Sequence, residues 1–249
     1  MKEEAIVIRG GLDESLTDMV KQYRALHPEA FVILSTWADT AEAVLQTVGA
    51  YVDDIVLNAR PPISGVHNIN YQIVCAANGV KRAVELGAER VLLTRTDIAL
   101  LRPDVLEKMR EELHAYDNRA AQRYGMKSRL LISDLYTMAT PPYHISDMFI
   151  YWHAEDVAKF WSIDSITEAC LRPEVTLCRD FAKRVGRPLE NNIADFIKLL
   201  GELFVIRSAP WFEFFWLRKS QYLSSAYIGN LTFITEDVWR AHCYREADG

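Results

Sequence analysis

The sequence predicts one α/β domain with a mostly parallel central sheet and a helical C-terminal extension. Short apolar runs alternate with amphipathic stretches through the first half of the chain, and this alternation is typical of a parallel sheet covered on both faces. With 249 residues, of which 50% are hydrophobic, the chain can bury a sizeable core. Because no linker rich in Pro, Gly or Ser divides the halves, residues 1–249 are expected to form a single domain.

Seven apolar runs are predicted as strands because each is short, rich in Val, Ile, Leu or Phe, and bounded by polar or turn-forming residues. In chain order they are Ala5–Ile8, Phe31–Leu34, Ile55–Leu57, Val91–Leu93, Leu130–Ile132, Met148–Tyr151 and Leu203–Ile206.

The segments between these runs show the three-and-four spacing of an apolar helical face. Asp13 or Ser15 can cap the first helix and Pro28 stops it, while Gly87 is suited to end the third. Residues 60–65 contain two consecutive prolines and are expected to form a loop. The expected helices cover residues 16–26, Ala41–Val48, Asn70–Leu86, Pro103–Tyr116, Val175–Val185 and Asn191–Leu200.

Composition and missing motifs exclude several classes of protein. The net charge of −6 argues against a general nucleic-acid binder. No GxxxxGK[ST], GxGxxG, GxSxG or HExxH string occurs, which removes common kinase, dehydrogenase, esterase and zinc-protease interpretations. The four cysteines form no CxxC pair, and neither a signal peptide nor a membrane-spanning run is found. A cytoplasmic protein with reduced thiols is therefore expected.

Arg95-Thr96-Asp97 directly follows the apolar run Val91–Leu93. Ligands of open α/β sheets bind at the carboxyl ends of the strands, where Asp97 could hold a divalent metal against a diphosphate. Asp97 could equally cap the next segment. Arg95 and Asp97 point to the same side of an extended chain, so they could form an ion pair or share a ligand.

Two further clusters also stand at strand ends. Arg9-Gly10-Gly11 ends the first strand, and its glycines allow close approach of a ligand, although an ordinary tight turn explains them too. Asp147 lies in a loop after Pro141-Pro142 and could act as a general base or form an Asx-turn. We expect Asp147 to approach the site from the side opposite Arg9, with His144 assisting in acceptor binding.

Residues 210–219 have the most unusual local composition, with five aromatic residues in six positions followed by Arg218 and Lys219. The segment Trp211–Trp216 could lie against a membrane surface and meet a lipid-linked acceptor. It could instead be a core helix or the wall of an acceptor pocket, which is the commoner fate of apolar residues.

In this order, these strings resemble the WavE family of lipopolysaccharide-synthesis proteins. The resemblance covers about the first 160 residues, and the strings that carry it are Ala5–Gly11, Phe31–Trp37, Asn68–Ile73, Leu93–Asp97 and His144–Phe149. It implies a glycosyltransferase of the GT-A type, with one Rossmann-like domain, a nucleotide-sugar donor and usually Mn²⁺ or Mg²⁺. The acceptor would be a growing surface glycan such as lipopolysaccharide or capsule, free or lipid-linked.

The resemblance also assigns roles to individual residues. Arg9 and Gly10 would hold the nucleobase and ribose, and Asn70 and Gln72 would reach the sugar or diphosphate from a helix N-terminus. Arg95 would bind the donor, and Asp97 would bind the metal that offsets the charge of the leaving diphosphate. Residues 1–100 would then form the nucleotide-binding half, and residues 101–249 the acceptor-binding half.

The sequence departs from the family pattern at two positions, and two alternatives stay open. The usual Asp-x-Asp is replaced by Arg95-Thr96-Asp97, and Tyr71 stands where Arg is expected. One alternative is a nucleotidyltransferase-like enzyme acting on sugar phosphates, although the basic glycine-rich loop expected after its first strand is missing. The other is a non-catalytic relative that binds a nucleotide or scaffolds an assembly.

Overall fold

The computed structural model describes residues 2–164, 166, 172–217 and 232–244. Its strands are β1 (Glu4–Arg9), β2 (Phe31–Trp37), β3 (Asp54–Asn58), β4 (Arg90–Arg95), β5 (Ile98–Leu100), β6 (Leu130–Ser133), β7 (Ile150–His153), β8 (Phe204–Arg207) and β9 (Phe214–Trp216). Its α-helices are α1 (Thr17–Leu26), α2 (Glu42–Gly49), α3 (Ile69–Glu85), α4 (Val105–Ala115), α5 (Arg119–Gln122), α6 (Ala154–Trp161), α7 (Pro173–Arg184), α8 (Ile193–Leu203) and α10 (Glu236–Val238).

Seven of these strands form one mostly parallel sheet in the order β3-β2-β1-β4-β7-β6-β8. β1, β2, β3 and β4 run parallel, whereas β7 is antiparallel to both of its neighbours, β4 and β6. β1 and β4 are central and almost fully buried, as expected for strands covered on both faces. The α/β class and the mostly parallel sheet predicted from the sequence are confirmed.

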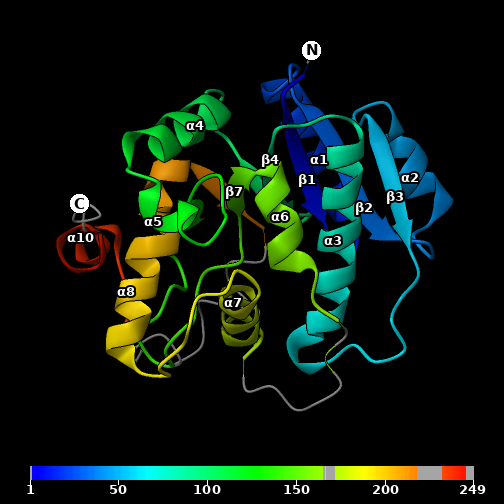
Figure 1. Cartoon of the computed structure of the whole chain (residues 1–249). Coiled ribbons are helices and arrows are strands. Elements are labelled where there is room, and N and C mark those ends of the chain that lie inside the picture. The colour runs from blue at the N-terminus through cyan, green and yellow to red at the C-terminus, as the bar shows by residue number, and fades with distance from the viewer. Residues whose placement is uncertain (1, 165, 167–171, 218–231, 245–249) are drawn as a thin grey trace.

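Helices cover the sheet on both faces (Figure 1). α3 and α6 pack together on the near face, and α1 and α2 lie behind it. The chain steps from β1 outward to β3 and then returns to β4 on the other side of β1, so right-handed crossovers place α3 on the face opposite α1 and α2. The strands β1 to β4 therefore end at the same, lower edge in Figure 1, and α7 lies beneath that edge.

Gly79 sets how closely α3 approaches the sheet. A Cβ atom at Gly79 would lie 2.5 Å from Val7 Cγ1 and 2.8 Å from Ser35 Cβ, which is too close for either to remain in place. We expect Gly79→Ala to lower the free energy of unfolding by about 1–3 kcal/mol through overpacking, despite the better helix propensity of Ala.

Urea unfolding of Gly79→Ala checks this prediction. Gly49→Ala is the control, because a Cβ at this α2 position would meet nothing within 4 Å, and its stability should match or exceed that of the wild type. A Gly79→Ala protein as stable as the wild type would show that α3 does not depend on this approach.

The second, two-stranded sheet departs from the sequence expectations. β5 follows directly after Asp97 and pairs in antiparallel fashion with β9, with Ile98 opposite Trp216. The aromatic segment does not form a core helix, one of the two alternatives to membrane contact: residues Ala209–Phe212 form a 3-10 turn and the strand β9 follows. Arg218 and Lys219 lie outside the described residues. Helix α6 was predicted only as part of the helical C-terminal extension, without bounds of its own.

Candidate functional site at the carboxyl edge of the sheet

A cleft of about 470 Å³ opens where β1, β2 and β4 end. Its walls come from these strand ends, the turn after β1, the loop before α3 and the first turns of α3. The lining residues are Arg9, Gly10, Gly11, Leu12, Asp13, Trp37, Arg60, His67, Asn68, Tyr71, Gln72, Cys75, Arg95, Thr96 and Asp97. The cleft therefore contains the ends of both β1 and β4, where the sequence placed its first two clusters.

The turn after β1 brings the backbone to the floor of the cleft. Gly10 has φ +125°, a conformation that L side chains rarely adopt, and its amide donates to the Ser35 carbonyl over 3.0 Å. Thr96 Oγ1 donates to the Gly11 carbonyl over 2.8 Å, which fastens the turn to the segment after β4. The backbone conformation of the turn therefore explains by itself why glycine stands at position 10. Contact between Gly10 and a donor stays a prediction.

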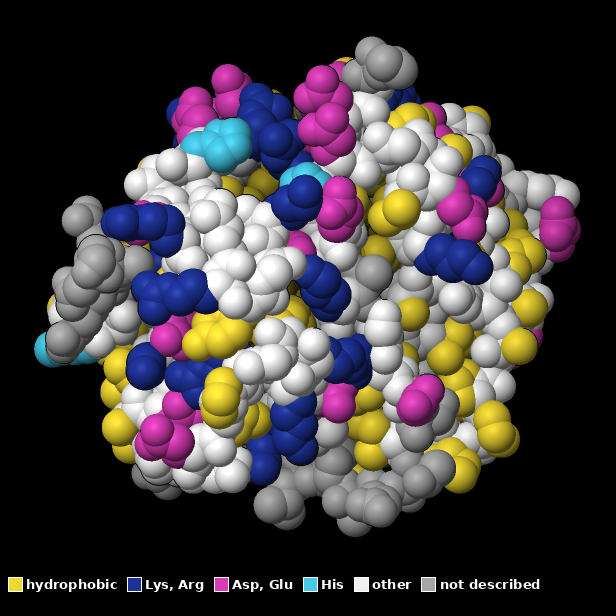
Figure 2. Space-filling model, viewed as in Figure 1, with side chains coloured by type: hydrophobic (Ala, Val, Ile, Leu, Met, Phe, Trp, Pro, Cys, Tyr) yellow, Lys and Arg dark blue, Asp and Glu magenta, His cyan; other side chains and the backbone are white. Residues whose placement is uncertain are grey.

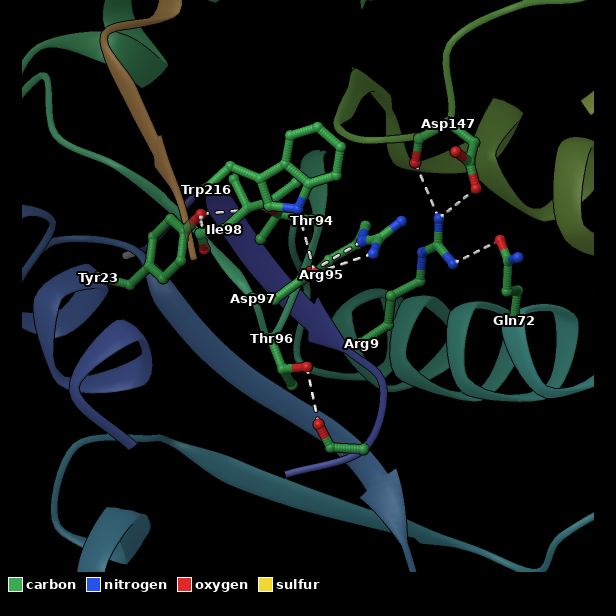
Figure 3. A network of polar contacts seen from close by, with 11 residues as sticks. Arg9, Tyr23, Gln72, Thr94, Arg95, Thr96, Asp97, Ile98, Asp147 and Trp216 are labelled. Atoms are coloured by element: carbon green, nitrogen blue, oxygen red, sulfur yellow. Dashed lines mark hydrogen bonds and ion pairs between the residues drawn. The ribbon is translucent and has the colours of Figure 1, made fainter. Parts of the chain in front are cut away.

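Arg95 and Asp97 form a bidentate ion pair at the end of β4 (Figure 3). Arg95 Nε donates to Asp97 Oδ1 and its second nitrogen to Oδ2, both over 2.9 Å. Trp216 Nε1 also donates to Asp97 Oδ2, over 3.2 Å, and the Asp97 carbonyl accepts from the Leu217 amide. The carboxylate of Asp97, whose side chain is 4% exposed, is therefore held by β4 and β9 together.

Arg9 and Asp147 form a second ion pair beside the first (Figure 3). One Arg9 guanidinium nitrogen donates to Asp147 Oδ2 over 2.9 Å and to the Asp147 carbonyl over 2.8 Å. The expectation that Asp147 approaches from the side opposite Arg9 is therefore wrong. Because β7 is antiparallel, the residues that precede it lie at the carboxyl ends of β1 and β4; among the described residues, no donor lies against Asp147 Oδ1.

The two amides assigned to the donor differ in their surroundings. Gln72 accepts from Arg9 over 3.1 Å and lines the cleft, so it helps to orient that guanidinium. Asn70 is buried outside the cleft lining, and its side chain bridges the Ile63 carbonyl and both backbone groups of Ile166. The structure gives Asn70 a clear role in joining two loops, and its contact with a donor stays a prediction.

His144 and Glu174 lie on the α7 side of Asp147. The His144 Nδ1 atom is 2.9 Å from the Tyr136 carbonyl, and its Nε2 atom is 3.6 Å from Glu174 Oε2. Burial lowers the pKa of His144 to about 4, so the ring is neutral near pH 7. Burial and the negative charge of Asp147 raise the pKa of Glu174 to about 7. The sequence marks Glu174 only as an acidic residue at a helix start, and sequence reasoning missed it.

Glu174 should make stability depend on pH. Its pKa of about 7 in the folded protein lies above the ordinary value of 4.5, so the stability it contributes is present below about pH 4.5 and is lost as the pH rises through about 7. We expect Glu174→Gln, which copies the protonated form, to melt higher than the wild type at about pH 8 and close to it at about pH 5.

Thermal melting at both pH values measures this difference. Glu155→Gln is the control, because the Glu155 side chain is 66% exposed, and it should show the same small shift at either pH. A Glu174→Gln shift that is equal at both pH values would mean that Glu174 is ionised throughout the range.

An aromatic pair, Trp37 and Tyr71, to which the sequence gave no binding role, lines the cleft wall near the end of β2. The Trp37 and Tyr71 rings meet edge to face with centroids 5.0 Å apart. The Arg60 guanidinium lies 4.7 Å from the Trp37 centroid and 5.5 Å from that of Tyr71, and it donates to Asp39 over 2.7 Å. The Arg60 guanidinium therefore lies near position 71, where the family pattern has Arg and α3 of this chain has Tyr. The sequence signals were the aromatic residue at the strand end and the departure from the family pattern at Tyr71.

The residues present do not fit a divalent metal at Asp97. Both Asp97 oxygens accept from Arg95, and one also accepts from Trp216, so a cation would have to displace a guanidinium. Mg²⁺ and Mn²⁺ prefer several oxygen ligands, and among the described residues no group of three or more His, Cys, Asp or Glu side chains could hold an ion. The expectation of Mn²⁺ or Mg²⁺ stays an untested prediction.

The surface around α7 is locally basic although the chain carries a net charge of −6. Lys and Arg side chains gather over and beside α7, below the carboxyl edge of the sheet (Figure 2). Such a local excess of positive charge favours the approach of anionic ligands.

The sequence raised two questions about membranes: whether a helix spans one, and whether Trp211–Trp216 lies against one. In the described part of the chain, no helix has the length and apolar character needed to cross a membrane. In the aromatic segment, Phe215 and Leu217 are exposed whereas Phe212 and Trp216 are buried. Peripheral membrane contact through Trp211–Trp216 stays a prediction.

The chain matches one family model and is similar to several solved structures. A family model described as WavE lipopolysaccharide synthesis matches residues 6–189. No curated protein matches the sequence.

Among solved structures, one similar protein comes from Desulfovibrio desulfuricans G20 and carries the name of a nucleotide-diphospho-sugar transferase, with 12% identity, 84% of this chain and 81% of that chain covered, and a TM-score of 0.42. A cytidylyltransferase from Leptospira borgpetersenii is 12% identical, with 67% of this chain and 66% of that chain covered and a TM-score of 0.40. A CMP:2-keto-3-deoxy-manno-octonic acid synthetase complexed with CTP is 10% identical, with 83% of this chain and 90% of that chain covered and a TM-score of 0.42. At these values the likeness does not decide which reaction this chain performs.

Proposed function

Since the chain belongs to the WavE lipopolysaccharide synthesis family, we propose that it is a glycosyltransferase. Its donor would be a nucleotide sugar, and its acceptor a growing surface glycan such as lipopolysaccharide or capsule. Family membership rests on the sequence match over residues 6–189.

One observation carries the proposal: Arg9 and Arg95, from adjacent strands, both line a cleft at the carboxyl edge of an α/β sheet. Guanidinium groups suit phosphate oxygens because they present several donors in a fixed plane. Arg9 Nε is buried and has no acceptor among the described residues, as expected of a donor that awaits a ligand. A diphosphate between these two groups would also meet the turn at Gly10.

The aromatic wall of the cleft supports a nucleoside. Trp37 and Tyr71 offer stacking surfaces to this cleft, and Arg60 offers a cation beside them. Bases stack readily on aromatic and guanidinium planes. Among the described residues, all those lining the cleft belong to the first 97, which supports the proposed division into a donor half, residues 1–100, and an acceptor half, residues 101–249.

Asp147 supplies the base in the proposed transfer. The acceptor hydroxyl gives its proton to the Asp147 carboxylate, and its oxygen forms the new bond to the anomeric carbon. The bond between that carbon and the diphosphate oxygen breaks, and its electron pair leaves with the nucleoside diphosphate. Arg9 holds one Asp147 oxygen in place, while His144, fixed by the Tyr136 carbonyl, would border the acceptor.

A panel of nucleotide sugars tests the proposal, each incubated with the protein while release of the nucleoside diphosphate is followed. We expect one donor to be hydrolysed slowly without acceptor and faster when a lipopolysaccharide acceptor is added. Release of pyrophosphate from a nucleoside triphosphate and a sugar phosphate would instead indicate nucleotidyl transfer. Nucleotide binding without any turnover would favour a non-catalytic relative.

A further inference from the structure

Asp97 stands where a metal-binding carboxylate is expected, yet its surroundings are those of a structural ion pair. Arg95 takes both of its oxygens in a bidentate pair, and Trp216 adds a third donor. A carboxylate that accepts three hydrogen bonds and is 4% exposed offers little room for a cation. A divalent ion at this place would also lie against the positive charge of the guanidinium.

The Arg95–Asp97 pair is held rigidly from outside β4. The backbone of β9 pairs with β5, and the Leu217 amide donates to the Asp97 carbonyl over 3.0 Å. Trp216 therefore presents its indole nitrogen to Asp97 from a strand whose register is fixed. A group held in this way can act without reorganising during a reaction.

Arg95 itself remains reachable from the cleft. Its side chain is 24% exposed and lines the cleft together with Arg9. Asp97 orients the guanidinium plane, and a planar guanidinium binds phosphate oxygens with defined geometry.

We propose that Arg95, oriented by Asp97, neutralises the donor diphosphate in place of a divalent metal, so that donor binding is independent of metal ions. The inference rests on the proposed function and specifies how its site treats the diphosphate. The electron pair of the breaking glycosidic bond moves onto a diphosphate oxygen, and Arg95 and Arg9 stabilise that developing charge as hydrogen-bond donors. Asp97 is then a positioning residue and Arg95 the group that touches the donor.

Calorimetric titration of the full chain with UDP, GDP, CDP and dTDP tests the inference, with either EDTA or Mn²⁺ present. We expect at least one nucleotide to bind with affinities that agree within about threefold in the two buffers, and Arg95→Met to weaken that binding by about 30-fold or more in both. Asp97→Asn, which keeps the shape but removes the charge, should weaken it by a smaller factor that is equal in EDTA and Mn²⁺.

Arg102→Met is the matched control. Arg102 donates to Asp104 over 2.8 Å, an Arg–Asp pair with the same spacing in sequence, and neither residue lines the cleft. This variant should bind the nucleotide as the wild type does.

Two results would overturn the inference, and they differ. Binding that is lost in EDTA, restored by Mn²⁺, and no longer restored in Asp97→Asn would make Asp97 a metal ligand while leaving the proposed function intact. The absence of binding by any nucleotide in either buffer would remove the proposed function and the inference together.

Discussion

The variant Asp97→Ala should turn over its donor about 10²–10³-fold more slowly than the wild type, the loss expected when a preorganised charge that stabilises a transition state is disturbed. The carboxylate fixes Arg95 through two 2.9 Å hydrogen bonds and is itself fixed by Trp216. Without it, Arg95 loses the partner that sets its orientation toward the cleft. The measurement is donor hydrolysis, with circular dichroism to confirm that the variant is folded.

A second carboxylate provides the matched control for this experiment. Asp104 also pairs with an arginine two residues before it, Arg102, but through one hydrogen bond from Nε and outside the cleft, so Asp104→Ala should keep turnover within about twofold of the wild type, as for an ordinary surface ion pair. Full activity in a folded Asp97→Ala protein would remove Asp97 from the site.

The variant Asp147→Asn should suppress sugar transfer by about 10²–10³-fold, as expected for loss of a general base, while changing nucleoside-diphosphate affinity only a few-fold. The amide oxygen of Asn can still accept from Arg9, and the backbone carbonyl of residue 147 also accepts from it. Arg9 therefore keeps its position, whereas no carboxylate remains at residue 147 to accept the proton of the acceptor hydroxyl. Transfer kinetics and calorimetry together separate the two effects.

Gln72→Met gives the converse pattern. It removes the other side-chain acceptor of Arg9 without touching the base, so it should weaken nucleotide binding more than it slows the saturated reaction. If Asp147→Asn abolishes nucleotide binding together with transfer, then Asp147 belongs to the donor site through its ion pair with Arg9. Unchanged transfer would leave Asp147 a turn residue.

Local sequence pattern was sufficient to predict most of the frame. β1, β2, β4 and α3 each bury an apolar run or face that is visible in a few consecutive residues. Such periodicity depends on neighbours along the chain, so it predicts element type well and bounds to within a few residues. Arg9 and Arg95 could be placed at strand ends for the same reason.

The partners of these residues were decided by tertiary structure alone. Arg9 and Asp147 are 138 residues apart in sequence, and they meet because β7 enters the sheet antiparallel. Asp97 and Trp216 are 119 residues apart, and they meet because β9 pairs with β5. No periodic pattern records which strand will lie beside which, nor that Glu174 will face Asp147 from α7.

The sequence by itself therefore determined that this chain forms a mostly parallel α/β sheet with charged side chains at its carboxyl edge. Only the tertiary structure decided that Trp216 joins Arg95 at the Asp97 carboxylate and that Arg9 pairs with Asp147, because contacts between segments far apart in sequence depend on how the whole chain packs.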